Sequence, residues 1–483
     1  MNAFDYLFEK TATLEKLFLV GKEECSFSHL YNSSIDLASW LEKEFGRDKN
    51  IILISTNNLF FLTSYLAIIK SGNVCIPLDP VIEKDNFRYI NDLTNPVLSF
   101  ITRDLKQKLG VDPSKCIFPE TISDYKAKSN NITDEVFDQE NCAEIIFTSG
   151  STGKPKGVII SHKNLIANTT SIVTYLKLDH NDRMLVVLPF YYCYGLSLLH
   201  THLRVGGSIV LNNSFIFLGR IITDLLDYKC TGFAGVPTHF QILLRKSDSF
   251  KNTNFPDLKY VTQAGGKLAP IFIDEFRQSL PYIKFIVMYG QTEATARLSY
   301  LPHELYVKKK GSMGKGIPGV ELKVVDEDGV VVKPGDTGEV IARGDNIMTG
   351  YFADDEGTQN ALRNGWLYTG DLGTVDDEGY IFLTARKKEI IKVRGKRISP
   401  KEIEAVILEI PEVIDCSVEG IEDEIEGEKI KATIVIKKDL NNPVTEESIK
   451  LHCSKHLALF KIPQVYDLKD NLTISATGKK IKK

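Results

Sequence analysis

The chain has 483 residues, which is too long for one hydrophobic core and predicts two or more domains. Its hydrophobic content of 43% is ordinary for a globular protein, and a formal net charge of -4 argues against binding of nucleic acid. The opening residues lack the features of a secretory signal, and the most apolar stretch, 51–69, is interrupted by Asn57 and Asn58, so no membrane span is expected.

In the first part of the chain, short apolar runs alternate with helical patterns. The segment 51–54 predicts a buried strand, 60–71 predicts a helix ended by Gly72, and 74–78 predicts the next strand. The same pattern returns later, with strands expected at 183–188, 208–211, 260–263 and 285–288. Strands that alternate with helices favour parallel sheets covered by helices on both faces.

The pattern changes at Gly311. Alternating apolar residues at 320–325, an Asp-Gly turn, and apolar runs at 330–332 and 338–342 predict hairpins of an antiparallel sheet or small β-barrel over about 311–385. A short α+β tail follows Arg386, with a helix expected to begin at Ser399 and Pro400. The predicted fold is therefore α/β: a large N-terminal domain of doubly wound sheets plus a small β-barrel (1–387), and a small mobile α+β domain (388–483).

The strongest motif is the loop at 147–158, which reads Phe-Thr-Ser-Gly-Ser-Thr-Gly-Lys-Pro-Lys-Gly-Val. Glycines let backbone N–H groups approach phosphate oxygens, while hydroxyls and lysines supply donors and positive charge. A flexible surface loop is the plain alternative, but this ordered mix between two apolar strands favours phosphate binding. A Walker A loop is disfavoured, because Pro155 stands where that motif needs a hydroxyl. The predicted ligands of ATP here are Thr148, Ser149, Gly150, Ser151, Thr152, Gly153 and Lys156.

This loop resembles the phosphate-binding signature of the adenylate-forming superfamily, which includes acyl-CoA synthetases, peptide-synthetase adenylation domains and luciferases. The remaining motifs occur in the expected order over nearly the whole chain. The resemblance implies that ATP converts a carboxylic acid to an acyl-AMP with release of pyrophosphate, and that the acyl group then passes to a thiol with release of AMP. It implies ATP and Mg²⁺ as cofactors, and CoA or phosphopantetheine as the thiol.

A second motif, Tyr289-Gly290-Gln291-Thr292-Glu293, follows the strand expected at 285–288. The chemistry calls for a carboxylate that holds Mg²⁺ against the phosphates, because magnesium prefers hard oxygen ligands. Glu293 fits this need, and with Thr148 it forms the predicted metal site. Thr292 is suited to donate to phosphate, and Tyr289 to offer a flat face to adenine. Taken alone, this segment would be read as a turn with a surface glutamate; its place after the glycine-rich loop favours the functional interpretation.

Asp371, in Tyr368-Thr369-Gly370-Asp371, is suited to accept hydrogen bonds from both ribose hydroxyls. The resemblance implies a ribose contact from Arg386 and a hinge at Lys388, about which the C-terminal domain rotates between the two steps. It also implies a thiol tunnel at Arg394 and Gly395, where glycine lets a pantetheine arm pass closely.

The last motif is Thr477-Gly478-Lys479. In the superfamily the matching lysine reaches the substrate carboxylate and the α-phosphate during adenylation. A cation there is physically useful, because two anions must meet and the transition state spreads negative charge around phosphorus. The residues implied to be catalytic are therefore Thr148, Lys156, Glu293, Lys388 and Lys479.

The acid pocket implied by the resemblance is formed by Tyr192, Gly195, Val236, Gln263, Ala264, Gly265 and Gly290, while Gly265, Gly266 and Lys267 back the adenine. Many acyl-CoA synthetases have a histidine where this chain has Tyr192, which cannot titrate near neutral pH. Amino-acid-activating members carry a Phe-Asp pair in this region, but here Tyr191 follows Phe190. A fatty or aryl acid is therefore favoured over an amino acid.

Several alternatives remain open. Free CoA and the phosphopantetheine of an acyl or peptidyl carrier protein present the same thiol, so either is a possible partner. A luciferase-like monooxygenase and a catalytically idle nucleotide-binding protein are the rivals from other classes. The His200 and His202 pair is interpreted as packing rather than a metal site, because no third ligand accompanies it. Eight cysteines without a CxxC pair indicate free thiols and a cytoplasmic location.

Overall fold

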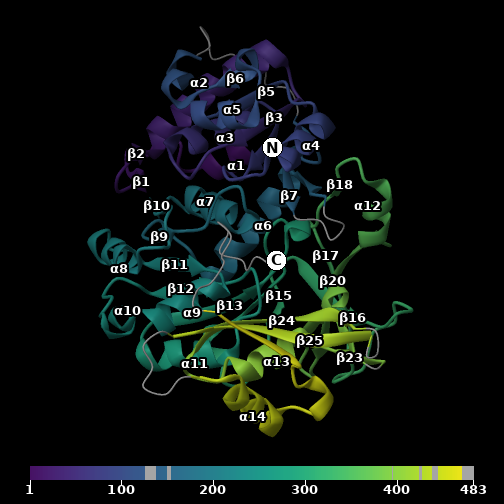
Figure 1. The fold of residues 1–483 in the computed structure, drawn as a ribbon. Coiled ribbons are helices and arrows are strands. Elements are labelled where there is room, and N and C mark those ends of the chain that lie inside the picture. The colour runs from purple at the N-terminus through teal and green to yellow at the C-terminus, as the bar shows by residue number, and fades with distance from the viewer. Residues whose placement is uncertain (126–136, 149–153, 394, 424–426, 438–443, 470–483) are drawn as a thin grey trace.

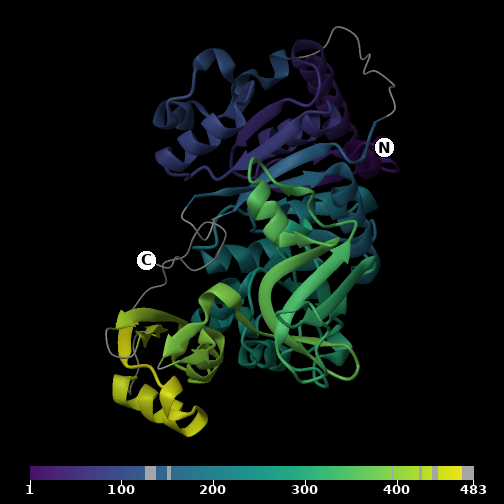
Figure 2. The same ribbon diagram turned by 90° about the vertical axis from the view of Figure 1, so that its right-hand side faces the viewer.

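The structure is a computed structural model that describes residues 1–125, 137–148, 154–393, 395–423, 427–437 and 444–469. Two large sheets, a smaller antiparallel sheet and a C-terminal α+β unit follow one another along the molecule (Figure 1). The first large sheet and its helices, drawn in purple and blue, form one end, and the C-terminal unit, drawn in yellow, lies at the other (Figures 1 and 2). The predicted mixed α/β class is confirmed.

The first sheet has seven strands in the order β18-β8-β7-β4-β3-β5-β6. Its central strands are parallel, as the alternation of strands and helices predicts. β3 and β4 are buried along almost their whole length, as expected for strands with helices on both faces. The bounds are β3 (Asn50–Ile54), β4 (Val74–Leu78), β5 (Leu98–Ile101), β6 (Cys116–Ile117), β7 (Cys142–Thr148), β8 (Lys156–Ser161) and β18 (Gly350–Tyr351).

The second sheet has nine strands in the order β15-β14-β13-β12-β11-β9-β10-β1-β2. Six neighbouring strands, in the order β13-β12-β11-β9-β10-β1, are mutually parallel, so their carboxyl ends meet at one edge. The bounds are β1 (Leu17–Val20), β2 (Cys25–Ser26), β9 (Arg183–Val186), β10 (Ser208–Leu211), β11 (Gly232–Gly235), β12 (Tyr260–Gln263), β13 (Lys284–Tyr289), β14 (Ser299–Leu301) and β15 (Lys315–Gly316).

The third sheet is antiparallel throughout, as the hairpin signals predict. It contains β16 (Val320–Val325), β17 (Gly338–Gly344), β19 (Leu362–Arg363), β20 (Trp366–Val375) and β21 (Ile381–Arg386). The predicted strand at 330–332 is reduced to a single bridge between Val325 and Val331. The reason is a tight turn in which the Asp326 carboxylate accepts hydrogen bonds from the N–H groups of Asp328 and Val330.

The C-terminal unit is a five-stranded sheet packed against two helices, α13 (Pro400–Ile407) and α14 (Glu446–His456). Its strands are β22 (Ile391–Val393), β23 (Lys396–Ile398), β24 (Val413–Asp423), β25 (Gly427–Ile436) and β26 (Val465–Lys469). The predicted domain boundary at 387/388 falls inside the short 3-10 helix η5 (Lys387–Glu389). Ser399 precedes α13 as expected, but its hydroxyl donates to the carbonyl of Thr384 instead of capping the helix.

Helices cover the two large sheets (Figures 1 and 2). They are α1 (Ala3–Phe8), α2 (Phe27–Phe45), α3 (Leu59–Lys70), α4 (Lys84–Thr94), α5 (Arg103–Leu109), α6 (His162–Leu176), α7 (Cys193–Val205), α8 (Leu218–Asp227), α9 (Pro237–Lys246), α10 (Asp248–Asn252) and α11 (Pro270–Ser279), with α12 (Asp355–Ala361) beside the third sheet. Within the described part of the chain, none of the helices has the length and apolar character needed to cross a membrane.

Candidate active site

A cavity of about 370 Å³ lies where the second sheet, the third sheet and the C-terminal unit meet. Its walls include the ends of β12 and β13, the strand β21 and the helix α13. Residues from motifs far apart in sequence therefore line one space. The sequence-predicted residues among its lining are Thr148, Tyr192, Gln263, Gly265, Gly266, Lys267, Tyr289, Gly290, Gln291, Thr292, Glu293, Asp371 and Arg386.

Asp371 is the centre of a hydrogen-bonded group in this cavity. The Tyr289 hydroxyl donates to its Oδ2 at 2.6 Å, and Arg386 Nε lies 3.4 Å from its Oδ1. Burial raises the pKa of Asp371 above its usual value, while the charge of Arg386 opposes that shift. Asp371 is a partly buried acceptor, and both of its carboxylate oxygens are already oriented. It is therefore well suited to hold a diol, which needs a carboxylate fixed in place.

Glu293 lies at the start of the next turn, in the 3-10 helix η3 (Thr292–Ala294). The Tyr351 hydroxyl donates to its Oε1 at 2.9 Å, and its backbone carbonyl accepts from the N–H of Met348. The Thr148 hydroxyl lines the same cavity. Carboxylate and hydroxyl oxygens are the donors that Mg²⁺ prefers, so this set fits the predicted magnesium site.

Lys156 begins β8 and does not line the cavity. Its Nζ forms an ion pair with Asp354 Oδ2 at 2.6 Å and lies 4.8 Å from the centre of the Tyr351 ring. Tyr351 is the last residue of β18, which pairs with β8, and Asp354 is the N-cap of the helix α12 that follows. For Lys156 to contact a phosphate as predicted, its ammonium group would have to break the ion pair with Asp354 or bind the phosphate and Asp354 at the same time.

The predicted acid pocket divides into two groups. Tyr192, Gln263, Gly265 and Gly290 line the cavity, and a Cβ at Gly265 would lie 3.0 Å from the Tyr192 hydroxyl. The remaining three predicted residues are buried beneath this lining: Gly195, Val236 and Ala264. Gly195 is needed for packing, since a Cβ there would lie 2.1 Å from the carbonyl oxygen of Pro189.

The C-terminal unit closes one side of the cavity with Glu389 and Lys401. Lys267 faces them, and its Nζ donates to the carbonyl of Leu383 at 2.7 Å. Desolvation in the cavity and the nearby charge of Lys401 lower the pKa of Lys267. The described lining thus carries three cationic side chains, Lys267, Arg386 and Lys401, beside three carboxylates, Glu293, Asp371 and Glu389. The cations can meet the phosphates of a nucleoside triphosphate, and the carboxylates can meet its ribose and a metal ion.

Other predicted residues lie elsewhere or outside the described ranges. Lys388 is the middle residue of η5. Gly395 has φ of +76°, so the turn between β22 and β23 is itself a reason for glycine there. The residues outside the described ranges are Ser149, Gly150, Ser151, Thr152, Gly153, Arg394 and Lys479.

Three functional contributions escaped the sequence analysis. Tyr351 orients Glu293, Asp354 pairs with Lys156, and Lys401 brings charge from the second domain. Tyr351 and Glu293 are 58 residues apart, and no local pattern links them. Gly350 and Tyr351 follow the segment Asp345-Asn346-Ile347-Met348-Thr349, which has no strand or motif pattern, so nothing in the sequence singles them out.

Comparisons with known proteins agree with this geometry. The family profile "AMP-binding enzyme" matches residues 8–352, and "AMP-binding enzyme C-terminal domain" matches 402–479. The oxalate–CoA ligase of Arabidopsis thaliana is 30% identical over 482 residues, covering 96% of this chain and 93% of that protein. The long-chain-fatty-acid–CoA ligase of Escherichia coli O157:H7 is 29% identical over 430 residues, which cover 86% of this chain and 75% of that protein.

Solved structures give the same result. The o-succinylbenzoate CoA synthetase of Bacillus subtilis in complex with its acyl-adenylate intermediate has a TM-score of 0.87 and 25% identity, covering 99% of this chain and 96% of that one. The same enzyme with ATP and a magnesium ion also has a TM-score of 0.87 and 25% identity, covering 99% and 98%. The chain therefore belongs to the AMP-binding enzyme family, the adenylate-forming ligases that activate a carboxylic acid with ATP and pass the acyl group to CoA.

Proposed function

We propose that the cavity between the large domain and the C-terminal unit is the adenylation site, and that this chain converts a fatty or aryl acid to its CoA thioester. The observation that carries the proposal is the convergence of Thr148, Glu293, Asp371 and Arg386 on one cavity, from motifs spread over much of the chain. ATP with Mg²⁺ is the nucleotide substrate, and a carboxylic acid and CoA are the other two.

In the first step, the acid's carboxylate attacks the α-phosphorus of ATP and pyrophosphate leaves. Asp371 accepts hydrogen bonds from the ribose hydroxyls, and Arg386, beside it, contributes a further ribose contact. The glycine-rich loop and Thr292 donate to the phosphates. Lys479, from the C-terminal unit, lowers the repulsion between carboxylate and α-phosphate. Catalysis by this set is positioning plus charge stabilisation, and a carboxylate nucleophile needs no general base.

Glu293 and Thr148 are the residues that would hold Mg²⁺. Bound there, the ion neutralises phosphate charge and stabilises the leaving pyrophosphate. Tyr351 keeps the Glu293 carboxylate turned to one side through its 2.9 Å hydrogen bond. That bond fixes a ligand in advance, which is the usual task of a residue behind a metal ligand.

In the second step, the thiol of CoA attacks the acyl carbonyl carbon and AMP leaves. Rotation about Lys388 exchanges the face of the C-terminal unit that meets the cavity, and Gly395 then lines the thiol's path. The phosphopantetheine of a carrier protein is the alternative acceptor. A carrier protein would dock on the surface of this chain, whereas CoA would bind through the phosphate of its adenosine moiety.

The proposed acid class rests on charge. Among the described residues that line the cavity, the carboxylates are Glu293, Asp371 and Glu389, and the first two already have nucleotide tasks. The predicted acid pocket supplies one wall of the cavity, formed by Tyr192, Gln263, Gly265 and Gly290. This wall offers no carboxylate to a substrate ammonium, which favours a fatty or aryl acid over an α-amino acid. The relatives act on oxalate and on long-chain fatty acids by name, so they span more than one acid class.

We also propose a cytoplasmic location. All eight cysteines are free thiols, and seven of them are buried. This usage fits a reducing compartment.

Acid-dependent ATP–pyrophosphate exchange tests the proposal, run over fatty acids of several lengths, aryl acids, dicarboxylic acids and amino acids. Exchange with one class, followed by CoA-dependent release of AMP, is the expected result. If AMP is released only when a phosphopantetheinylated carrier protein is present, the carrier protein is the acceptor in place of CoA. Nucleotide binding with no exchange for any acid would support the idle-binder alternative, and acid-dependent oxygen uptake the luciferase-like one.

A further inference from the structure

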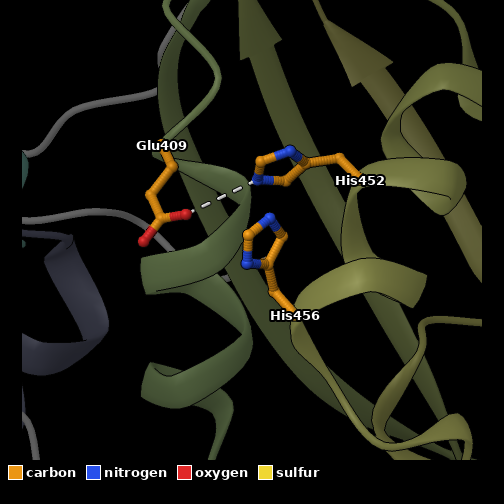
Figure 3. A group of neighbouring side chains, drawn as sticks. All are labelled: Glu409, His452 and His456. Carbon is orange, nitrogen blue, oxygen red and sulfur yellow. Dashed lines mark ion pairs between the residues drawn. The ribbon is translucent and has the colours of Figure 1, made fainter.

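Three side chains with metal-ligating atoms meet on the surface of the C-terminal unit, away from the adenylation cavity. They are Glu409, His452 and His456, and one ligand atom of each lies within 4.8 Å of the others. Figure 3 shows the carboxylate and both imidazole rings turned toward one another from two separate chain segments. We propose that this group is a binding site for a late first-row divalent cation, with Zn²⁺ as its preferred occupant.

Helical spacing brings the two histidines together. His452 and His456 are four residues apart on α14, so their side chains lie on one face of the helix. Their ring centres are 4.7 Å apart. Two imidazole rings at this distance can both direct a nitrogen lone pair at one cation. One face of α14 therefore supplies two of the three ligands.

The third ligand comes from a different element. Glu409 directly follows Leu408, the C-cap of α13, and its Oε2 lies 3.6 Å from His452 Nε2 (Figure 3). The plain alternative is a surface ion pair, which contributes little to stability. An ion pair would need only one histidine, however, and the second imidazole at the same spot is what a metal site requires.

The backbone beneath these side chains is held firmly. Ile403 and Ile407 of α13 and Ile449 and Cys453 of α14 are fully buried in the core between the two helices. The ligands project from the edge of that packed seam, so a cation would need side-chain rotation only. Tetrahedral ligands at Zn–N and Zn–O distances of about 2.0–2.1 Å stand roughly 3.4 Å apart, somewhat closer than the present limit of 4.8 Å.

One contact changes when the cation binds. His452 Nε2 donates to the carbonyl of Val406 at 3.1 Å. Coordination through this nitrogen replaces that hydrogen bond, and the ring proton then resides on the other nitrogen. Two imidazoles and one carboxylate are the borderline ligand set that suits Zn²⁺, Co²⁺ and Ni²⁺ and does not suit Mg²⁺. The site is thus chemically distinct from the magnesium site proposed at Glu293.

Its place in the fold gives the site a structural consequence. The carbonyls on either side of Glu409, those of Leu408 and Ile410, accept hydrogen bonds from Arg245 of the large domain. A cation held by Glu409 and α14 would therefore brace the segment through which the C-terminal unit contacts the large domain.

The test uses the full-length, tag-free chain without nucleotide, titrated with Co²⁺ and followed by its visible absorption. We expect saturable binding of one ion, weakened about 100-fold or more in His452→Ala and in His456→Ala. His29→Ala, which removes an exposed histidine of α2, should bind as the unaltered protein does. Zn²⁺ should compete with Co²⁺ and raise the thermal unfolding midpoint of the unaltered protein but not of His456→Ala.

His456 is exposed, and within the described ranges its side chain packs on the ring of His452. The variant His456→Ala should therefore fold normally. Equal Co²⁺ affinity in the double variant His452→Ala/His456→Ala would overturn the proposal. So would binding that never saturates. ATP–pyrophosphate exchange reports separately on the adenylation site, so failure of one proposal is distinguishable from failure of the other.

Discussion

Arg245 of α9 donates from Nη1 to the carbonyl oxygen of Val413, at the start of β24, over 2.8 Å. The same Nη1 also donates to the carbonyls of Ile410 and Pro411, and Glu275 holds the other side of the guanidinium at 2.5 Å. One arginine of the large domain, whose side chain is buried, therefore holds the C-terminal unit in the orientation that Figure 2 shows.

Loss of the Arg245 hydrogen bonds should slow adenylation and spare thioester formation. Over 99% of its length the chain matches a structure that holds ATP and a magnesium ion, with a TM-score of 0.87, so we infer that this orientation belongs to adenylation. Arg245→Ala should slow pyrophosphate exchange by about 10-fold or more, because even one hydrogen bond to a charged group contributes about 1.5–3 kcal/mol and this orientation is no longer favoured. Thioester formation from supplied acyl-AMP should be unchanged or faster.

Arg88→Ala is the matched control, since Arg88 forms an exposed ion pair with Asp85 on α4. It should leave both half-reactions unchanged. An equal loss of both half-reactions in Arg245→Ala would mean that Arg245 stabilises the fold generally and does not select an orientation.

Asp371 supports a prediction about nucleotide binding. Asp371→Asn keeps one oxygen acceptor but removes the charge opposite Arg386, and it weakens the acceptor of the Tyr289 hydroxyl. We expect the KM for ATP to rise about 10- to 100-fold with little change in the KM for the acid. Asp377→Asn, in the exposed turn between β20 and β21, serves as control. A change confined to the acid's KM would contradict the ribose assignment.

Tyr351 allows the magnesium assignment to be tested without touching a metal ligand. Tyr351→Phe removes the hydroxyl that donates to Glu293 and keeps the ring beneath Lys156. The Mg²⁺ concentration for half-maximal exchange should rise about 10-fold, as is common when a residue that orients a ligand is lost. Tyr31→Phe, whose ring packs on Phe4, should not change it. An unaltered Mg²⁺ dependence in Tyr351→Phe would remove support for Glu293 as the metal ligand.

Much of this architecture follows from local sequence signals. The apolar runs at 51–54, 74–78 and 208–211 form strands. A strand that is covered on both faces needs apolar side chains at consecutive positions, and these runs have that pattern. The motif at Tyr289 reaches the cavity because it follows the carboxyl end of a parallel strand, where such sheets gather their sites.

The rest depends on contacts between distant segments. Arg245 and Val413 are 168 residues apart, and a lysine or arginine late in a helix is ordinary in any sequence. Ser399 has the residue type of an N-cap, yet a neighbouring carbonyl at Thr384 takes its hydroxyl. Glu409 and the α14 histidines carry no shared pattern until the two helices pack together. Tertiary packing decides such pairs, so local sequence cannot predict them.

Glu144 supplies a pH-dependent prediction. It lies in the middle of β7, the strand that leads to Thr148, and its Oε2 accepts from the Tyr65 hydroxyl at 2.8 Å. The Tyr65 oxygen also lies 2.7 Å from His200 Nε2. Burial raises the pKa of Glu144 to about 7, with the Tyr65 bond opposing the shift. Burial lowers the pKa of His200 to about 3, so this histidine stays neutral.

A carboxyl whose pKa is higher in the folded state than in the unfolded state binds its proton more tightly when folded. Its stabilising contribution is therefore complete below the unfolded pKa of 4.5 and is lost as pH rises through about 7. The shift corresponds to about 3 kcal/mol. Glu144→Gln cannot titrate, so the stability of the unaltered protein relative to this variant should fall between pH 5 and pH 7 and stay constant above about pH 8.

Urea unfolding midpoints measured from pH 5 to pH 8 on both proteins check this, with Glu15→Gln as the exposed control. The control should follow the unaltered protein at every pH, because the Glu15 side chain is exposed and the substitution leaves the buried group at Glu144 intact. A constant difference between the unaltered protein and Glu144→Gln across this range would mean that Glu144 is ionised in the fold. In that case the Tyr65 hydroxyl and a charged His200 would have to hold a buried carboxylate within β7, the strand that ends at Thr148.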